Sequence, residues 1–144
     1  MAATAAPHPA PAILVVDDDA DIRAITAEVL RDAGYRAAMA ATHAAAHTAL
    51  RATRFALVLA DTAVAGALVQ EQWEALAALR AAAGAVPVVI FTAHPPARFA
   101  DHAARGFAGL VTKPFDVDAL LAVVRAACGV VVPRVAALQA CARA

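Results

Sequence analysis

Length, composition and charge already exclude several classes of protein. A chain of 144 residues that is 62% hydrophobic has room for one domain with a substantial core. The net charge is zero and the arginines are scattered, so the chain lacks the basic patch of a nucleic-acid-binding protein, and no apolar run reaches the roughly 18 residues that span a membrane.

The two ends are predicted to lie outside the domain. Residues 1–11 are rich in alanine and proline and have neither the basic nor the apolar region of a signal peptide, which predicts a disordered leader on a soluble, cytoplasmic protein. Residues 129–144 are predicted to be a tail too short for an output domain. Cys128 and Cys141 lack metal-site spacing and are expected to be unpaired thiols.

Between these ends, residues 12–128 alternate short apolar runs with stretches of helical periodicity, which is typical of strand–helix units around a parallel sheet. The predicted strands are Ala12–Val16, Tyr35–Ala40, Phe55–Ala60, Val86–Thr92 and Gly109–Val111. Two of the five predicted helices are given by their ranges, Thr42–Thr53 and Ala97–Arg105. The first and third predicted helices each have an apolar face and end at a glycine: Ile22, Ile25, Val29 and Ala33 before Gly34, and Val69, Trp73 and Leu76 before Gly84. The last predicted helix lies between Asp116 and Gly129 and has Val117, Leu120, Leu121 and Val124 on one face. The pattern predicts an α/β domain with a doubly wound, five-stranded parallel sheet.

Residues that carry chemistry follow four of these strands. Because ligands of open parallel sheets bind beyond the carboxyl ends of the strands, the residues at those ends are the candidates for a site. They are Asp17, Asp18 and Asp19 after the first strand, Asp61 after the third, Thr92 at the end of the fourth and Lys113 after the fifth.

The carboxylates predict a metal ion. Asp17, Asp18 and Asp61 would raise one another's pKa without a counter-charge, and a divalent cation supplies one. Oxygen ligands with no histidine or cysteine beside them favour Mg²⁺ over Zn²⁺. Asp19 and Asp21 are interpreted as the N-terminus of the first helix.

Asp61 has a second predicted role, as a nucleophile that attacks a phosphoryl group. Lys113 and the hydroxyl of Thr92 would then neutralise and hydrogen-bond the phosphoryl oxygens. Lys113 is the only lysine among 12 basic residues, and a compact, mobile ammonium suits that task better than the planar fork of arginine.

Four stretches in chain order, "ILVVDDDADIR", "FALVLAD", "VPVVIFTA" and "GLVTKPF", resemble the signature stretches of the two-component response-regulator receiver domain. The resemblance covers about Ala12 to Cys128 and implies a flavodoxin-like (βα)5 fold. It also implies that Asp61 is the phosphoacceptor and that Thr92 and Lys113 contact the phosphoryl group. Asp18 and Asp61 would hold Mg²⁺ directly, Asp17 would act through water, and the carbonyl of Ala63 would be a further ligand. A cis peptide would precede Pro114.

The function implied by the resemblance is a stand-alone receiver. It would take a phosphoryl group from a histidine kinase or phosphotransfer protein and signal to a downstream protein by contact, with a homodimer left open. It would not be an enzyme beyond phosphorylating itself from phosphodonors and slowly dephosphorylating itself.

The sequence departs from the family pattern at two places. The loop "DTAVAGALV" has Ala65 where the family has proline and Leu68 where it has an acid, and Leu110 stands where an aromatic residue usually couples to the threonine. These departures keep open a second reading, a pseudo-receiver that acts as an unphosphorylated interaction scaffold.

A third reading, a phosphatase of the haloacid-dehalogenase type, is disfavoured because Ala63 stands where such an enzyme needs its second acid. His94 is expected on the surface, with the hypothesis that it borders the path of a hydrolytic water. His43 and His47 have metal-site spacing but no third ligand, and are predicted to face solvent.

Overall fold

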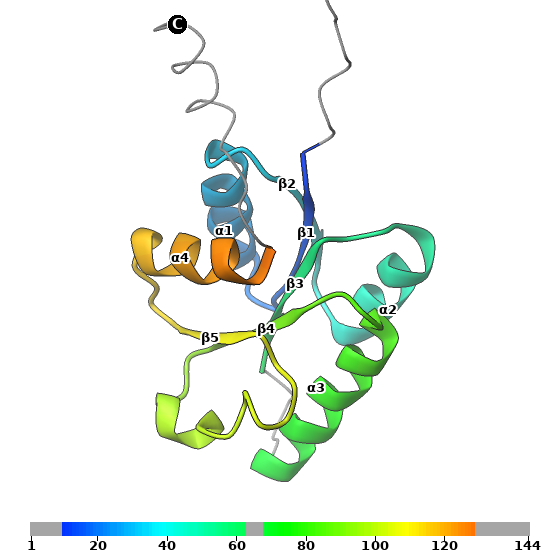
Figure 1. The fold of residues 1–144 in the computed structure, drawn as a ribbon, viewed down its shortest axis with the longest axis vertical. Helices are drawn as coiled ribbons and strands as arrows, with labels where there is room; N and C mark the ends of the chain where they lie inside the picture. Colours follow the sequence, from blue (N-terminus) through cyan, green and yellow to red (C-terminus); the bar gives the residue numbers. More distant parts are fainter. Residues whose placement is uncertain (1–9, 63–67, 129–144) are drawn as a thin grey trace, which may run out of the picture.

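The computed structural model describes residues 10–62 and 68–128. Its elements are β1 (Ala12–Val16), α1 (Ala20–Asp32), β2 (Arg36–Ala40), α2 (His43–Ala52), β3 (Leu57–Asp61), α3 (Val69–Ala83), β4 (Val88–Thr92), the 3₁₀ helix η1 (Pro96–Phe99), β5 (Gly109–Thr112) and α4 (Val117–Cys128). All neighbouring strands are parallel, in the order β2-β1-β3-β4-β5. Helices α1 and α4 cover one face of the sheet, and α2 and α3 cover the other (Figure 1). The predicted doubly wound, flavodoxin-like α/β fold is confirmed.

The three central strands are hydrophobic throughout because both of their faces are covered. Every residue of β1, β3 and β4 is buried. Alternate side chains face opposite helix layers, so that Leu14 and Ile90 pack towards α2 and α3 while Ile13 and Val89 pack towards α1 and α4. This arrangement holds the ends of the central strands in fixed register.

The ends of the helices follow from local chemistry. Asp19 is the N-cap of α1, where its carboxylate accepts from the backbone N–H groups of Asp21 and Ile22, as expected for a helix N-terminus. Thr42 caps α2 in the same way by accepting from the N–H of Ala45. Gly34 and Gly84 follow the ends of α1 and α3 as predicted, with positive φ values of 100° and 64°, which glycine adopts readily.

Two predicted apolar faces are partly wrong. Ile25 on α1 is 51% exposed and Val117 on α4 is 44% exposed, whereas Thr26 and Ala27 are buried instead. The hydroxyl of Thr26 donates to the carbonyl of Ile22, so a polar residue takes a core position without an unpaired group.

The predicted helix Ala97–Arg105 is wrong as well. Only the single 3₁₀ turn η1 forms, followed by turns up to residue 106. Most hydrogen bonds of this stretch span three residues, such as those from the N–H of Ala100 to the carbonyl of Ala97 and from the N–H of His102 to the carbonyl of Phe99. Tertiary contacts to Trp73 override the helical periodicity, because the ring of Phe99 lies 5.1 Å from the Trp73 ring and the Arg105 guanidinium lies 4.1 Å above it.

Several sequence predictions lie outside the described residues. They concern most of the leader at 1–11, the tail at 129–144 with Cys141, the stop at Gly129, and the loop positions Ala63 and Ala65. Ala10 and Pro11, at the end of the predicted leader, are described, and their carbonyls accept hydrogen bonds from Arg36. Cys128 is a free, half-buried thiol. None of the described helices has the length and apolar character needed to cross a membrane.

Candidate functional site

The predicted acidic residues meet where the strand order reverses, between β1 and β3. Carboxylate oxygens of Asp17, Asp18 and Asp61 all lie within 4.8 Å of one another. Asp17 and Asp61 are buried at the carboxyl ends of their strands, and Asp18 is exposed at the mouth of the site. This is the crevice in which doubly wound sheets bind ligands.

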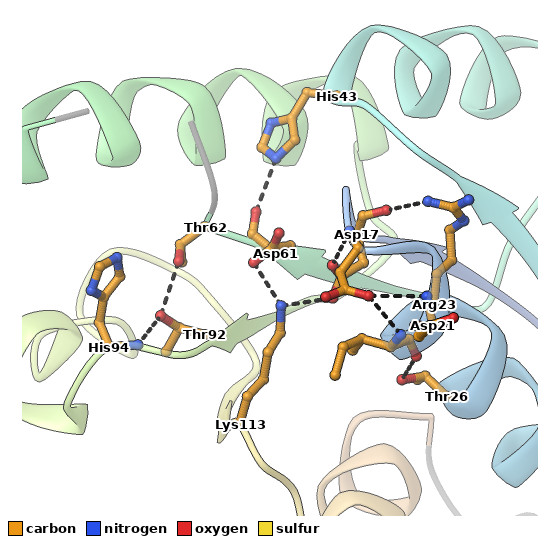
Figure 2. A network of polar contacts seen from close by, with 12 residues as sticks. Asp17, Asp21, Arg23, Thr26, His43, Asp61, Thr62, Thr92, His94 and Lys113 are labelled. Carbon is orange, nitrogen blue, oxygen red and sulfur yellow. Dashed lines mark hydrogen bonds and ion pairs between the residues drawn. The ribbon is translucent and has the colours of Figure 1, made fainter. Parts of the chain in front are cut away.

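Lys113 enters the same cluster from the loop after β5. Its Nζ lies 2.7 Å from Asp17 Oδ2 and donates a hydrogen bond of 2.9 Å to Asp61 Oδ1 (Figure 2). The backbone N–H of Lys113 donates to the carbonyl of Thr92 at 2.7 Å, which fixes the start of the loop against β4. The Lys113–Pro114 peptide is cis, as the resemblance implies.

Burial and charge act in opposite directions on this cluster. Burial raises the pKa of Asp61 above its ordinary value, the hydrogen bond and positive charge of Lys113 act to lower it, and the neighbouring Asp17 and Asp18 raise it further, so that the pKa remains raised. Burial acts to lower the pKa of Lys113, but the carboxylates of Asp17 and Asp61 together outweigh it and raise that pKa. Lys113 is therefore charged at neutral pH, and the ionised form of Asp61 is held at a cost to folding.

We expect Asp61→Asn to stabilise the metal-free protein at neutral pH. A carboxyl whose pKa is raised on folding favours the folded state at low pH, and this contribution is lost as the pH rises from about 4 through the raised pKa. The asparagine side chain of the variant does not titrate, so the variant does not lose stability in this way as the pH rises. In chelator, its melting temperature should exceed that of the wild type by a few degrees at pH 7, and the difference should shrink towards zero on acidification.

Thermal melts from pH 3.5 to pH 8 measure this effect. Asp32→Asn, which removes an exposed carboxylate at the end of α1, is the matched control and should show little difference. A variant that is less stable than the wild type at pH 7, by an amount independent of pH, would mean that the ion pair with Lys113 outweighs the burial of Asp61.

Asp17 is held in place by hydrogen bonds, and its second carboxylate oxygen faces the Lys113 ammonium. Its Oδ1 accepts from the N–H of Asp19 at 2.9 Å, and its carbonyl accepts from Arg23 at 2.7 Å. Its Oδ2 is buried and pairs with Lys113 Nζ at 2.7 Å. With two more carboxylates in reach, this donor set fits the hard, oxygen-liganded sphere of Mg²⁺.

The cluster opens into a cleft of about 430 Å³. Its lining consists of Asp18, Asp19, Ile22, Asp61, Thr62, Ala93, His94, Lys113 and Pro114. Thr92 does not line the cleft, since it is fully buried and its hydroxyl accepts from the N–H of His94 at 3.0 Å. The same hydroxyl lies 2.9 Å from that of Thr62. Of the predicted site residues in the described part of the chain, Asp17 and Thr92 are therefore the two that do not line the cleft.

His94 lies at the side of the cleft with both ring nitrogens engaged. Its Nδ1 lies 2.9 Å from Arg98, which can only donate, so Nδ1 accepts. The Nε2 atom faces the side-chain amide of Gln72 at 3.3 Å. Neither nitrogen is free to activate water. That His94 borders the path of a hydrolytic water stays a prediction.

Thr62 has no role predicted from the sequence, and His43 does not face solvent as predicted. His43 is half-buried, and its Nε2 lies 3.0 Å from the backbone carbonyl of Asp61 (Figure 2). A carbonyl only accepts, so Nε2 donates and links the start of α2 to the end of β3. No sequence pattern reveals a contact to a backbone atom, whereas the alternation along β3 and β4 could have placed Thr62 beside Thr92.

Comparisons with known proteins agree with this geometry. Residues 13–125 match the family model of the response regulator receiver domain. No curated protein matches the sequence.

Several solved structures are similar to the chain. A response regulator receiver protein from Burkholderia phymatum is 31% identical, with a TM-score of 0.71 over 85% of this chain and 98% of that one. The chemotaxis protein CheY4 of Vibrio cholerae is 26% identical, with a TM-score of 0.70 over 82% of this chain and 98% of that one. A response regulator from Thermotoga maritima, at 22% identity and a TM-score of 0.71 over 83% of this chain and 98% of that one, supports the fold alone.

Proposed function

This chain belongs to the response regulator receiver domain family, and we propose that it accepts a phosphoryl group on Asp61 from the phosphohistidine of a histidine kinase or phosphotransfer protein. Phosphorylation would then alter the contacts that the domain makes with a downstream protein. The observation that carries the proposal is the convergence of three carboxylates and one ammonium at the switch point of the sheet.

The transfer is a displacement at phosphorus. A carboxylate oxygen of Asp61 forms the new O–P bond, the N–P bond of the phosphohistidine breaks, and the released imidazole nitrogen keeps the electron pair and takes a proton from solvent. The product is an acyl phosphate. Lys113, whose Nζ is within 2.9 Å of Asp61 Oδ1, is placed to pair with a phosphoryl oxygen bound there.

The metal would be Mg²⁺. Asp18 and Asp61 would hold it directly, Asp17 through water and Ala63 through its carbonyl, and the ion would supply positive charge for the phosphoryl oxygens. The three carboxylates support this assignment, since their oxygens lie within 4.8 Å of one another.

A protein donor needs a surface next to the cleft. Ile22 lines the cleft, and Ile25, one turn later on α1, is 51% exposed. Exposed apolar side chains beside a charged cleft are typical of a protein docking site, so we place the donor against this end of α1.

The first test uses acetyl phosphate as a small phosphodonor, with intact mass as the readout. We expect the wild type to gain one phosphoryl group in Mg²⁺ and none in excess chelator. Asp18→Asn, which removes a carboxylate without burying a new group, should need a Mg²⁺ concentration at least about 10-fold higher for the same gain.

An equal gain with and without metal would contradict the assignment of Mg²⁺. No gain in any condition would favour the unphosphorylated scaffold over the phosphoacceptor.

A further inference from the structure

Thr62 and Thr92 form a buried hydroxyl pair beside the cleft. Thr62 follows β3 and Thr92 ends β4, and the register of the two strands sets the residues next to each other. Their Oγ1 atoms are 2.9 Å apart, and the residues are 2% and 0% exposed (Figure 2). Resting on the function proposed above, we propose that Thr62 is a positioning residue that holds the Thr92 hydroxyl away from the phosphoryl site.

The number of donors and acceptors in the pair supports this role. A threonine hydroxyl has one hydrogen and two lone pairs. Thr92 accepts from the N–H of His94, and Thr62 is its second partner. The Thr92 hydroxyl is therefore satisfied where it is, inside the protein and not at the cleft surface.

In the observed position the Thr92 hydroxyl is fully buried and paired with Thr62, so contact with a phosphoryl group on Asp61 requires it to leave this pairing. When it turns towards the cleft, the hydroxyl of Thr62 loses its partner while still almost fully buried. An unpaired buried polar group is unfavourable, so the pair shifts the equilibrium towards the turned-away orientation.

Removing the Thr62 hydroxyl should reverse this preference. In Thr62→Val, the Thr92 oxygen still accepts from the N–H of His94, but its contact with the Thr62 hydroxyl is lost, so the buried orientation keeps one hydrogen bond instead of two. The orientation towards the phosphoryl oxygens would then be favoured, because an acceptor is present there.

The expected result is tighter binding of an acyl phosphate mimic. We expect Thr62→Val to bind beryllofluoride in the presence of Mg²⁺ about 5- to 10-fold more tightly than the wild type in titration calorimetry. Thr62→Ser, which keeps the hydroxyl, should stay within about 2-fold of the wild type. Thr62→Ala removes the hydroxyl with less bulk than valine, and should also bind more tightly if the valine variant folds poorly.

A double-mutant cycle separates this role from a structural one. In a Thr92→Val background, Thr62→Val should leave the beryllofluoride affinity unchanged, because the group that it releases is absent. Equal or weaker binding by both Thr62→Val and Thr62→Ala would overturn the proposal, and so would an equal gain in the Thr92→Val background. If the wild type itself neither binds beryllofluoride nor accepts a phosphoryl group, the proposed function fails and this inference fails with it.

Discussion

Asp61→Asn is expected to abolish phosphoryl transfer to the protein. The substitution keeps the shape of the side chain but replaces the nucleophilic carboxylate by an amide, which cannot form a stable acyl phosphate. No mass gain should appear from acetyl phosphate in Mg²⁺ under conditions in which the wild type is fully modified. The folded state should survive, since the charge that is removed is one whose burial opposes folding.

Asp32→Asn serves again as the control, because it removes one exposed carboxylate and leaves the site intact. It should accept a phosphoryl group at the rate of the wild type. If Asp61→Asn retained half or more of the wild-type rate, the phosphoacceptor would be another residue.

Replacement of Lys113 should have the next largest effect. Lys113→Met keeps most of the apolar length but removes the charge that lies 2.7 Å from Asp17 and 2.9 Å from Asp61. We expect the rate of phosphorylation by acetyl phosphate to fall by about 100-fold, the size of effect seen when a preorganised donor is lost from a buried site. The melting temperature in chelator should also fall, because two buried carboxylates lose their cation.

Lys113→Arg tests why this position holds the only lysine of the chain. The guanidinium is longer and planar, and its donors cannot converge on one point between two carboxylates as an ammonium does. We expect phosphorylation to remain at least about 10-fold slower than in the wild type although the charge is kept. Arg54→Met, at an exposed cation, controls for net charge. A wild-type rate in Lys113→Arg would reduce the role of Lys113 to charge alone.

The parts of the fold and site that the sequence predicts are those fixed by strands. An apolar run such as Leu57–Ala60 is unambiguous because a strand covered on both faces must be apolar throughout. The residue after such a run then has a defined place at the edge of the sheet, which is how Asp17 and Asp61 could be brought together from the sequence.

The failures concern residues whose place depends on distant partners. Ala97–Arg105 has helical periodicity, but its side chains are held by Trp73 on α3, and this contact has no local signal. The periodicity of α1 likewise could not show that Thr26 would bury its hydroxyl against its own backbone while Ile25 remained exposed. The contact between Thr62 and Thr92 differs, since it joins the ends of two predicted neighbouring strands and could have been predicted from their alternation.

Chemical mapping of the modified residue tests directly whether Asp61 is the phosphoacceptor. After incubation with acetyl phosphate and Mg²⁺, reduction with borohydride converts an aspartyl phosphate to homoserine, which peptide mass spectrometry can locate. We predict homoserine at position 61 in the phosphorylated wild type, and aspartate at that position when the phosphodonor is omitted. Homoserine at another aspartate, or a phosphoryl group that resists borohydride on a serine, threonine or histidine, would contradict the assignment of Asp61 as the phosphoacceptor.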